Sequence, residues 1–154
     1  MNLLVTNART AQAYVIIRCL RPHARKIVAE TYGHSALAAR ISPAANSRLV
    51  DRVCRLPYPA RDWLAGRLQP TNTEAEERYL EALLDVCARE QIDTIFPSLD
   101  AQVYILSKNR ARLQARGIFA PVPDYETLLG SLDKYRTIQA AAAAGFPHPR
   151  TLLG

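Results

Sequence analysis

Short apolar runs alternate with segments of helical periodicity through most of this chain. The runs span 3–6, 26–30, 49–56, 92–97 and 118–120, and the helical segments span 10–20, 73–90 and 101–115. Short apolar runs between turn signals are typical of buried strands, and a 3.6-residue period is typical of helices. Because strands that alternate with helices are joined by right-handed crossovers, we expect an α/β fold with a parallel sheet and helices on both faces. The expected strand order is 3-2-1-4-5.

The helical segments carry signals for their buried faces and their starts. Four apolar residues share one face of 10–20, namely Ala13, Ile16, Ile17 and Leu20. Thr73 and Glu76 fit a capping box at the start of 73–90. Two further expectations concern the less regular regions: Ser35 caps a short helix that runs to Arg40, and Trp63 with Leu64 anchors its segment on the core.

The charge balance is basic, with a net charge of +6 and a pI of about 9.5. Nucleic acid is the first partner that such a balance suggests. Arginines, however, are spread over the expected helices and do not cluster, and the lysines are only Lys26, Lys108 and Lys134. We therefore expect no nucleic-acid partner. A basic cleft also suits a nucleoside triphosphate or an acidic substrate.

Cysteine and histidine usage argues against disulfides and metal sites. Cys19, Cys54 and Cys87 are odd in number, lack CxxC spacing and lie in apolar contexts, so we expect three small core residues in a reducing, cytoplasmic setting. The three histidines share no ligand spacing. The apolar run 13–17 ends at Arg18, far short of the roughly 20 residues that span a bilayer, and no signal peptide is evident. We expect no membrane partner.

Two loops qualify as a binding site, because ligands of open parallel sheets lie beyond the carboxyl ends of the strands. After the first run, Asn7, Arg9 and Thr10 could bind an anionic group of a substrate. After the fourth, Ser98 and Asp100 could recognise a substrate amine or hydroxyl. The alternative is purely local: turn and cap roles for Asn7 and Thr10, a solvated Arg9, and helix-start roles for Ser98 and Asp100.

Several familiar chemistries lack their motifs. The first loop has no G-x-G-x-x-G pattern, so its backbone cannot approach a pyrophosphate closely, and dinucleotide binding is disfavoured. No phosphate-binding P-loop and no nucleophile–base arrangement stand out. We therefore assign no catalytic residue within the chain.

The last quarter contains a basic helix start and a proline-punctuated exit. Asp133 is a good N-cap for a helix that runs to Ala144, and the segment 145–149 reads Gly-Phe-Pro-His-Pro. Lys134 and Arg136 fall in the first turn, where the helix dipole disfavours cations. Backbone N–H groups and a lysine at a helix start form a natural phosphate site, so we expect an anion there.

This pattern resembles the opening of an ATP-grasp domain. The stretch 90–151 is similar to ATP-grasp proteins related to the carbamoyl-phosphate synthase large subunit. Residues 1–120 look like the Rossmann-like pre-ATP-grasp domain of those enzymes, and 121–154 like the start of the ATP-grasp domain. The resemblance implies that Lys134 contacts ATP phosphates. Arg136 would support that site or pair with a nearby carboxylate, and the alternative for Lys134 is an ordinary surface lysine.

The function implied by the resemblance is an ATP-dependent ligase. Such enzymes join a small-molecule carboxylate to an amine or thiol through an acyl phosphate, with ATP and Mg2+. The family's second lysine, glycine-rich loop and metal ligands lie downstream of the region matched here. We therefore expect a truncated fragment that is inactive alone, and a homodimer is one way to cover its last helix. The alternatives are a stand-alone Rossmann-like module for a small ligand or nucleotide, and a non-catalytic interaction domain that uses the last helix.

Overall fold

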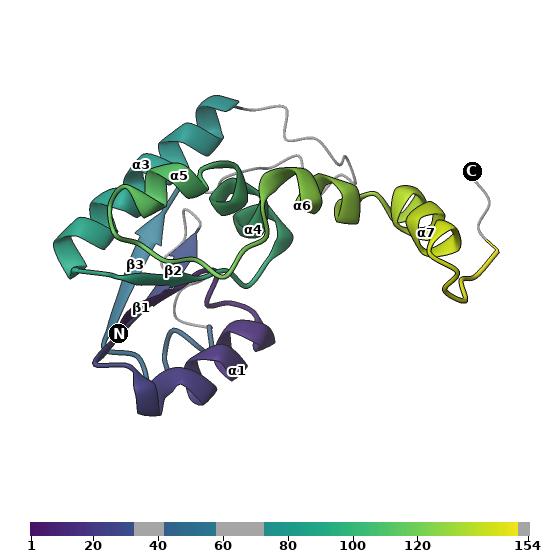
Figure 1. Ribbon diagram of the computed structural model, residues 1–154. Coiled ribbons are helices and arrows are strands. Elements are labelled where there is room, and N and C mark those ends of the chain that lie inside the picture. Colours follow the sequence, from purple (N-terminus) through teal and green to yellow (C-terminus); the bar gives the residue numbers. More distant parts are fainter. Residues whose placement is uncertain (33–41, 58–72, 151–154) are drawn as a thin grey trace.

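The computed structural model describes residues 1–32, 42–57 and 73–150 (Figure 1). Its strands are β1 (Asn2–Val5), β2 (Lys26–Tyr32), β3 (Arg52–Leu56) and β4 (Thr94–Phe96). Its helices are α1 (Ala11–Leu20), the short 3-10 helix η1 (Arg21–His23), α3 (Thr73–Glu90), α4 (Asp100–Lys108), α5 (Arg110–Gln114), α6 (Tyr125–Leu132) and α7 (Lys134–Ala143). The expected helix after Ser35 and the expected anchor at Trp63 and Leu64 lie outside the described residues.

The strands form one parallel sheet, which within the described residues has the order β3-β2-β1-β4. Leu4 in β1 pairs with Val28 on one side and with Ile95 on the other. The expected fifth strand is reduced to a bridge between Thr94 and Phe119, in which the Ile95 N–H donates to the Phe119 carbonyl at 2.8 Å. The predicted α/β class and strand order are confirmed, with the last strand shorter than expected.

Helices cover both faces of the sheet, as Figure 1 shows with α1 on one side and α3, α4 and α5 on the other. Alternate strand residues point to opposite faces. The α1 face buries Leu3, Val5, Ile27 and Ala29 with Ala13 and Ile17. The α3 and α4 face buries Leu4, Val28 and Ile95 with Leu80, Leu83 and Ile105. An apolar core therefore lies on each face of the sheet, between the sheet and the helices that cover it.

Helix α1 has the cap and the face that its sequence predicts. The Thr10 hydroxyl accepts from the Ala13 N–H at 3.1 Å, and Ala13 and Ile17 are buried. The expectation of three core cysteines is wrong for Cys19, which is exposed on the outer face of α1, while Cys54 is partly buried and Cys87 is buried. Apolar neighbours in sequence did not show on which face of the helix Cys19 lies.

The expected helix over 101–115 is divided at Asn109 into α4 and α5. The Asn109 side-chain amide donates to the Ile105 carbonyl at 2.9 Å, and the backbone at Asn109 leaves the helical conformation. Asn side chains that bond nearby carbonyls compete with regular helix geometry. This competition accounts for the break.

Strand β3 begins at Arg52, not at 49 as predicted. The side chain of Asp51, just before the strand, bonds to β2 and fixes where the preceding turn ends. The Asp51 carboxylate accepts from the Ile27 N–H at 2.6 Å and from Arg21 at 2.7 Å. These bonds and the positive charge of Arg21 hold the pKa of Asp51 below its usual value, although partial burial alone would raise it. Asp51 therefore takes the place of a backbone acceptor at the start of the sheet.

Glu76 of α3 forms an ion pair with a residue of α4. Its carboxylate accepts from Lys108 Nζ of α4 at 3.0 Å, and its side chain is nearly buried between α3 and α4. The predicted capping box with Thr73 stays a prediction, and Glu76 has in addition a cation from α4 that the local sequence of α3 does not reveal. The pair joins the two helices on this face of the sheet.

Helix α6, which the sequence analysis did not predict, continues the body of the molecule. Asp124 caps it by accepting from the Thr127 N–H at 2.9 Å. Leu128 joins the core on the α3 and α4 face, and the Tyr125 hydroxyl lies 2.7 Å from that of Tyr104 in α4. The boundary predicted after residue 120 stays a prediction, and residues 121–132 pack on the sheet domain.

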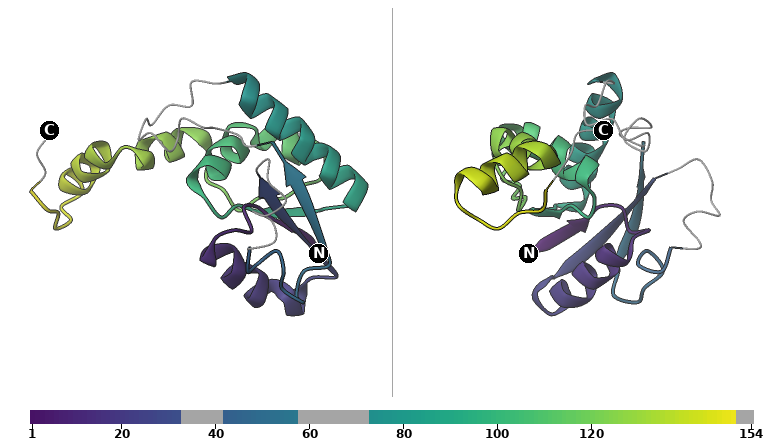
Figure 2. Two further views of the ribbon diagram at one scale, coloured as in Figure 1. Left: turned by 180° about the vertical axis from the view of Figure 1, so that it is seen from behind. Right: turned by 90° about the vertical axis from the view of Figure 1, so that its right-hand side faces the viewer.

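Helix α7 stands apart from this packing. All its residues are described, and none of them is buried. In Figures 1 and 2 it projects beyond α6, away from the sheet. In the described part of the chain, no helix is both long and apolar enough to cross a membrane.

Candidate functional site

The two loops predicted from the sequence meet at the carboxyl edge of the sheet. The Ser98 N–H donates to the Thr6 hydroxyl at 3.1 Å, and the Ser98 hydroxyl donates to the Thr6 carbonyl at 2.6 Å. The Thr10 and Ser98 hydroxyls lie 3.4 Å apart. Because β1 and β4 are neighbours, the loops after them are joined into one polar surface, as the strand order predicted.

Asn7 has the most constrained backbone of this surface. Its φ is 47°, in the left-handed region that asparagine tolerates better than most residues. Its carbonyl accepts from the Thr10 N–H at 3.2 Å, and its N–H donates to Glu30 Oε2 of β2 at 2.7 Å. Its side chain is buried, and Oδ1 has no hydrogen-bond partner in the described structure. Asn7 therefore takes the turn role that was predicted for it, and its side-chain oxygen is still available to accept a hydrogen bond.

The remaining residues of the loops divide into local and exposed roles. Thr10 caps α1, as its alternative interpretation predicted. Ser98 does not cap α4, whose N-cap is Leu99; its bonds to Thr6 instead hold the two loops together. Arg9 and Asp100 are exposed at the same edge. The structure thus brings all five predicted loop residues to one edge of the sheet.

Glu30 is the residue of this edge that sequence reasoning missed. It is fully buried within β2, two residues before the strand ends at Tyr32. Burial raises the pKa of Glu30 from 4.5 to about 7, although the bond from the Asn7 N–H acts against this rise. The second oxygen, Oε1, has no hydrogen-bond partner among the described residues. An ionisable residue at the end of the apolar run Ile27-Val-Ala was the available signal.

A buried polar cluster continues from Glu30 into the layer of α3 and α4. Tyr79 of α3 and Gln102 of α4 are fully buried, and neither the Tyr79 hydroxyl nor the Gln102 amide atoms have a hydrogen-bond partner in the described chain. Burial and the charge of Glu30 raise the pKa of Tyr79 well above its usual value, while the nearby Gln102 side chain acts weakly in the opposite direction. The carboxyl edge therefore has a polar interior as well as a polar surface.

The second predicted site is the start of α7. Asp133 caps this helix as predicted, because its carboxylate accepts from the Tyr135 N–H at 2.9 Å and from the Arg136 N–H at 3.2 Å. These amides are therefore already bonded. Arg136 Nε lies 3.5 Å from the Asp133 carboxylate, and Lys134 is exposed. At this helix start, the Lys134 side chain is thus the group best suited to contact an anion.

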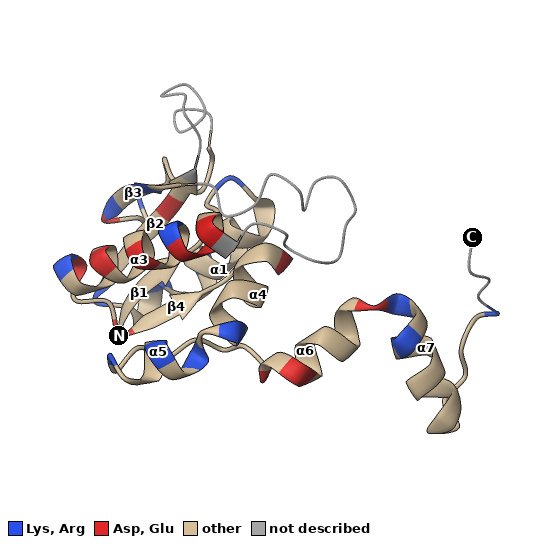
Figure 3. Ribbon diagram, turned by 90° about the horizontal axis from the view of Figure 1, so that it is seen from above, with Lys and Arg blue, Asp and Glu red and all other residues tan. Residues whose placement is uncertain are grey.

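The two predicted sites are separate in the structure. The loops follow β1 and β4, whereas α7, which carries Lys134 and Arg136, projects beyond α6 (Figure 2). Figure 3 shows Lys and Arg on α3, α5, α7 and β3, with acidic residues interleaved on α3, and no single continuous basic band. Among the described residues, no group of His, Cys, Asp and Glu is arranged to hold a metal ion.

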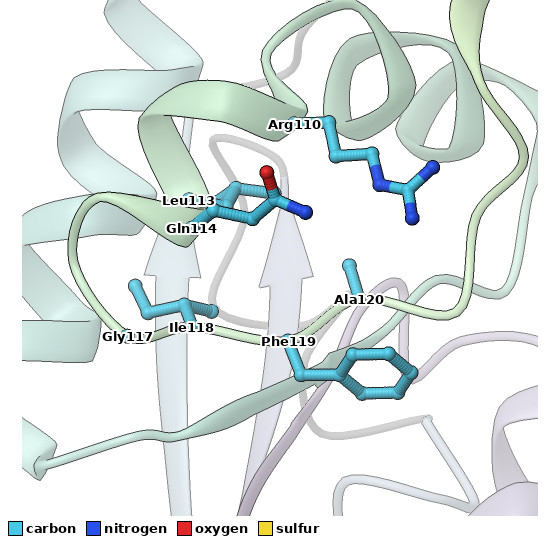
Figure 4. Close-up of a pocket in the computed structure, with 7 residues that line it drawn as sticks. All are labelled: Arg110, Leu113, Gln114, Gly117, Ile118, Phe119 and Ala120. Carbon is cyan, nitrogen blue, oxygen red and sulfur yellow. The ribbon is translucent and has the colours of Figure 1, made fainter.

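An open cavity of about 230 Å³ lies elsewhere, between α5 and residues 117–120. Figure 4 shows the Arg110 guanidinium and the Gln114 amide on the α5 side, with the Phe119 ring on the other side. None of the predicted site residues lines this cavity.

Comparisons with known proteins agree with the resemblance seen in the sequence. The family model described as PylC-like, N-terminal domain, matches residues 70–121. Fifty chains of solved structures match as well, and a search of curated proteins gave no match. One matching structure is the biotin carboxylase domain of a single-chain bacterial carboxylase, with 22% identity and a TM-score of 0.57. That match covers 96% of this chain and 30% of the other.

The family model matches only part of this chain. The structural match shows the shared fold, and the family model covers α3 to the bridge at Phe119. The chain spans less than a third of the matching structure.

Proposed function

We propose that this chain forms the N-terminal part of an ATP-dependent ligase that joins a small-molecule carboxylate to an amine or thiol. The similarity to a PylC-like N-terminal domain and to a biotin carboxylase domain supports the assignment to the ligase class. The observation that carries the proposal within this chain is the capped start of α7, which holds a lysine in its first turn. That arrangement suits an anionic group such as a nucleotide phosphate.

Lys134 is the residue proposed to contact the phosphates of ATP. It is exposed, and the helix start that carries it adds the positive end of the helix dipole. Arg136 is already paired with Asp133, so its proposed role is to balance the cap carboxylate and strengthen the positive field around Lys134. The proposal therefore assigns the direct contact to one side chain.

The proposed reaction has two steps. A substrate carboxylate oxygen bonds to the γ-phosphorus of ATP while the bond to the bridging oxygen breaks, which releases ADP and leaves an acyl phosphate. The nucleophile then bonds to the acyl carbon, the carbon–oxygen bond to the phosphate breaks, and phosphate leaves as the nucleophile loses its proton. Asn7, Arg9, Thr10, Ser98 and Asp100 are proposed to bind the substrate. No residue described here is assigned a covalent role.

Magnesium belongs to the proposed class of reaction, but the described residues do not fit it. They contain no cluster of His, Cys, Asp and Glu that could hold a metal ion, so none of them is proposed as a magnesium ligand. We further propose that the protein is cytoplasmic and has no nucleic-acid partner. It would form a homodimer through α7.

The first test is to read the encoding DNA past codon 154. A continuing frame with a glycine-rich loop and a later Glu and Asn pair of metal ligands supports the ligase. A stop codon at that point contradicts catalysis by this chain and favours the alternative, a stand-alone module for a small ligand.

The second test uses the protein encoded by the full frame. With ATP, a panel of carboxylates and hydroxylamine as the trap, we expect ADP and a hydroxamate, which reports an acyl phosphate. Lys134→Ala should reduce ADP formation at least tenfold, while Arg18→Ala, which removes an exposed cation on α1, should leave it unchanged. ADP formation that is equal in both variants would contradict the role of Lys134. Residues 1–154 alone are expected to show no turnover.

A further inference from the structure

The parallel sheet has an open edge beyond β4, at Phe119. The Phe119 N–H donates to the Asp93 carbonyl at 2.9 Å, and the Phe119 carbonyl accepts from the Ile95 N–H at 2.8 Å. Both backbone groups of this residue are therefore used on the side of β4. The backbone groups of consecutive strand residues point in opposite directions within a sheet. Those of Ile118 and Ala120 accordingly point away from β4, to the outer side of the sheet.

Two of these outward groups are bonded within the chain, and two are free. The Ile118 N–H donates to the Leu113 carbonyl at 3.0 Å, and the Ala120 carbonyl accepts from the Val122 N–H at 2.9 Å. The Ile118 carbonyl and the Ala120 N–H have no hydrogen-bond partner in the described chain. One acceptor and one donor on either side of an edge residue are the groups that a neighbouring strand bonds, whether it runs parallel or antiparallel. This edge can therefore pair with one short strand.

The cavity of about 230 Å³ lies along this edge. Figure 4 shows α5 on one side of it, with the Arg110 guanidinium, the Gln114 amide and the Leu113 side chain. The ring of Phe119 lies on the other side, and this residue is 62% exposed. Side chains of a strand alternate between its two faces. A strand added at this edge would therefore pack its side chains alternately against α5 and against Phe119.

Two arginines at this edge have no acidic partner. Arg110 lines the cavity, and Arg116 lines a second cavity, of about 300 Å³, that shares Ile118 with the first. Neither arginine takes part in an ion pair of the described residues. The pKa of Asp124 is lowered chiefly by its bonds from Thr127, and the charge of Arg110 is the smallest of the causes. A guanidinium binds a carboxylate through two parallel hydrogen bonds, so the charge of this edge favours an acidic partner.

We propose that this edge binds an extended acidic segment of a partner polypeptide, which adds a short strand beside Phe119. The backbone of the partner would accept from the Ala120 N–H and donate to the Ile118 carbonyl. Its acidic side chains would lie on the α5 side, next to Arg110, and an apolar side chain would pack on the Phe119 ring. In strand addition of this kind, backbone bonds give affinity and the alternate side chains give specificity.

The described end of this chain does not supply such a segment to a second copy. Residues 145–150 contain two prolines, which have no N–H to donate, and no acidic side chain. The occupant is therefore a different polypeptide. None of the residues proposed to bind ATP or the substrate lines the cavity, so the inference does not depend on the ligase reaction.

The test uses the full 154-residue chain without ATP and the peptide acetyl-Thr-Glu-Val-Glu-Thr-amide. When its valine lies opposite Phe119, both glutamates lie on the α5 side, because directly paired residues share a face. We expect saturable shifts of the Ala120 amide in NMR spectra and slower exchange of its proton with solvent, since this N–H gains an acceptor. With one bridge and exposed ion pairs, the dissociation constant should be on the order of millimolar.

Two control peptides separate the backbone bonds from the charge. N-methylation of the three central residues removes their donors for either strand direction and should weaken binding at least fivefold. Lysine in place of both glutamates reverses the charge that faces Arg110 and should also weaken binding at least fivefold.

Three variants of the protein locate the site. Phe119→Ala and Arg110→Gln should each weaken binding of the acidic peptide at least threefold. Both residues are exposed, so the amide spectrum should remain that of a folded protein. Arg18→Gln changes an exposed cation on α1 and should bind the peptide as the parent does.

The proposal fails if the Ala120 amide shows no saturable shift, or if either control peptide binds as well as the acidic one. Unchanged affinity in both Phe119→Ala and Arg110→Gln would likewise overturn it, because the peptide would then bind elsewhere. Shifts of the Ala120 amide that depend on protein concentration without peptide would identify a second copy as the occupant, which also contradicts the proposal. Because ATP is left out, none of these results bears on Lys134 or on acyl phosphate formation.

Discussion

The sheet domain and helix α7 both contain regular helices, but different interactions hold them. In α3, Tyr79, Leu80 and Leu83 are fully buried against the sheet. In α7 every residue is described and none is buried. Its supports are the Asp133 cap and the bonds from the Thr137 hydroxyl to the Gly130 and Ser131 carbonyls of α6. Helices shorter than about 12 residues are marginal in water on their own. The comparison shows that a helical sequence pattern reports the conformation of a segment, not what stabilises it.

The largest expected difference follows from truncating the core. Leu83→Ala removes a fully buried side chain from the layer between α3 and the sheet, so the free energy of unfolding should fall by about 2–5 kcal/mol. Ile138→Ala in α7 should lower it by much less. Urea denaturation of both variants measures the contrast. Similar losses in the two would mean that α7 packs on the body and that the comparison fails.

The next effect is a pH dependence of the free energy of unfolding, caused by Glu30 in the sheet domain. Glu30 has a pKa of about 7 in the folded state and 4.5 as its ordinary value, so between these limits the folded chain holds a proton that the unfolded chain has lost. Its stabilising contribution is full below pH 4.5 and is lost as the pH rises through 7. The loss is about 3 kcal/mol at most.

Glu30→Gln should remove this dependence, and chemical denaturation between pH 5 and pH 8 measures it. The pKa values of Asp51 and Asp93 are lowered, so the stability that they contribute is lost below pH 4, outside the window tested. A slope that persists in Glu30→Gln would assign the titration to another group.

A smaller effect is expected at the joint between the two regions. Tyr125→Phe removes the hydroxyl that lies 2.7 Å from that of Tyr104, which should cost about 1 kcal/mol of stability. Tyr135→Phe, in exposed α7, is the matched control and should cost nothing measurable. Thermal unfolding of Tyr104→Phe and of the double variant tests the coupling. Additive losses would show that the two hydroxyls act independently.

The smallest global effect is expected from the cap of α7. Asp133→Ala should destabilise α7 locally by about 1 kcal/mol and leave the melting temperature of the body unchanged. Faster amide exchange confined to 134–143 would report the loss, and Asp133→Asn should retain most of the protection. A fall in the melting temperature of the whole chain would show that α7 supports the body.

Periodicity predicted the strands and helices of the sheet domain, because β1 and β2 are largely buried and their sequences are apolar runs. The strand order followed from the general arrangement of such α/β sheets, not from periodicity. Periodicity missed α6, which follows Pro121 and Pro123 and has Asp124 as its N-cap. The break at Asn109 depends on a side chain that bonds back to the helix, which the residue type allows but does not require.

The candidate site was predicted only in part. The loop residues followed from strand order, and the Asp133 cap followed from residue type. Glu30 could not be placed, because its role depends on the Asn7 N–H, which lies 23 positions away in sequence. The sequence likewise could not show which amides the Asp133 carboxylate bonds, because this depends on the backbone geometry; the structure shows that they are those of Tyr135 and Arg136.

The position of β1 in the middle of the sheet has a kinetic consequence. Residues 2–5 pair with 26–29 on one side and with 94–96 on the other. During synthesis the central strand therefore leaves the ribosome first and waits about 90 residues for its second neighbour. Contacts of such sequence separation slow folding, since a long loop must close before they form. Until β4 arrives, one edge of β1 remains open to pairing with other chains, and this interval is when a chaperone would be most useful.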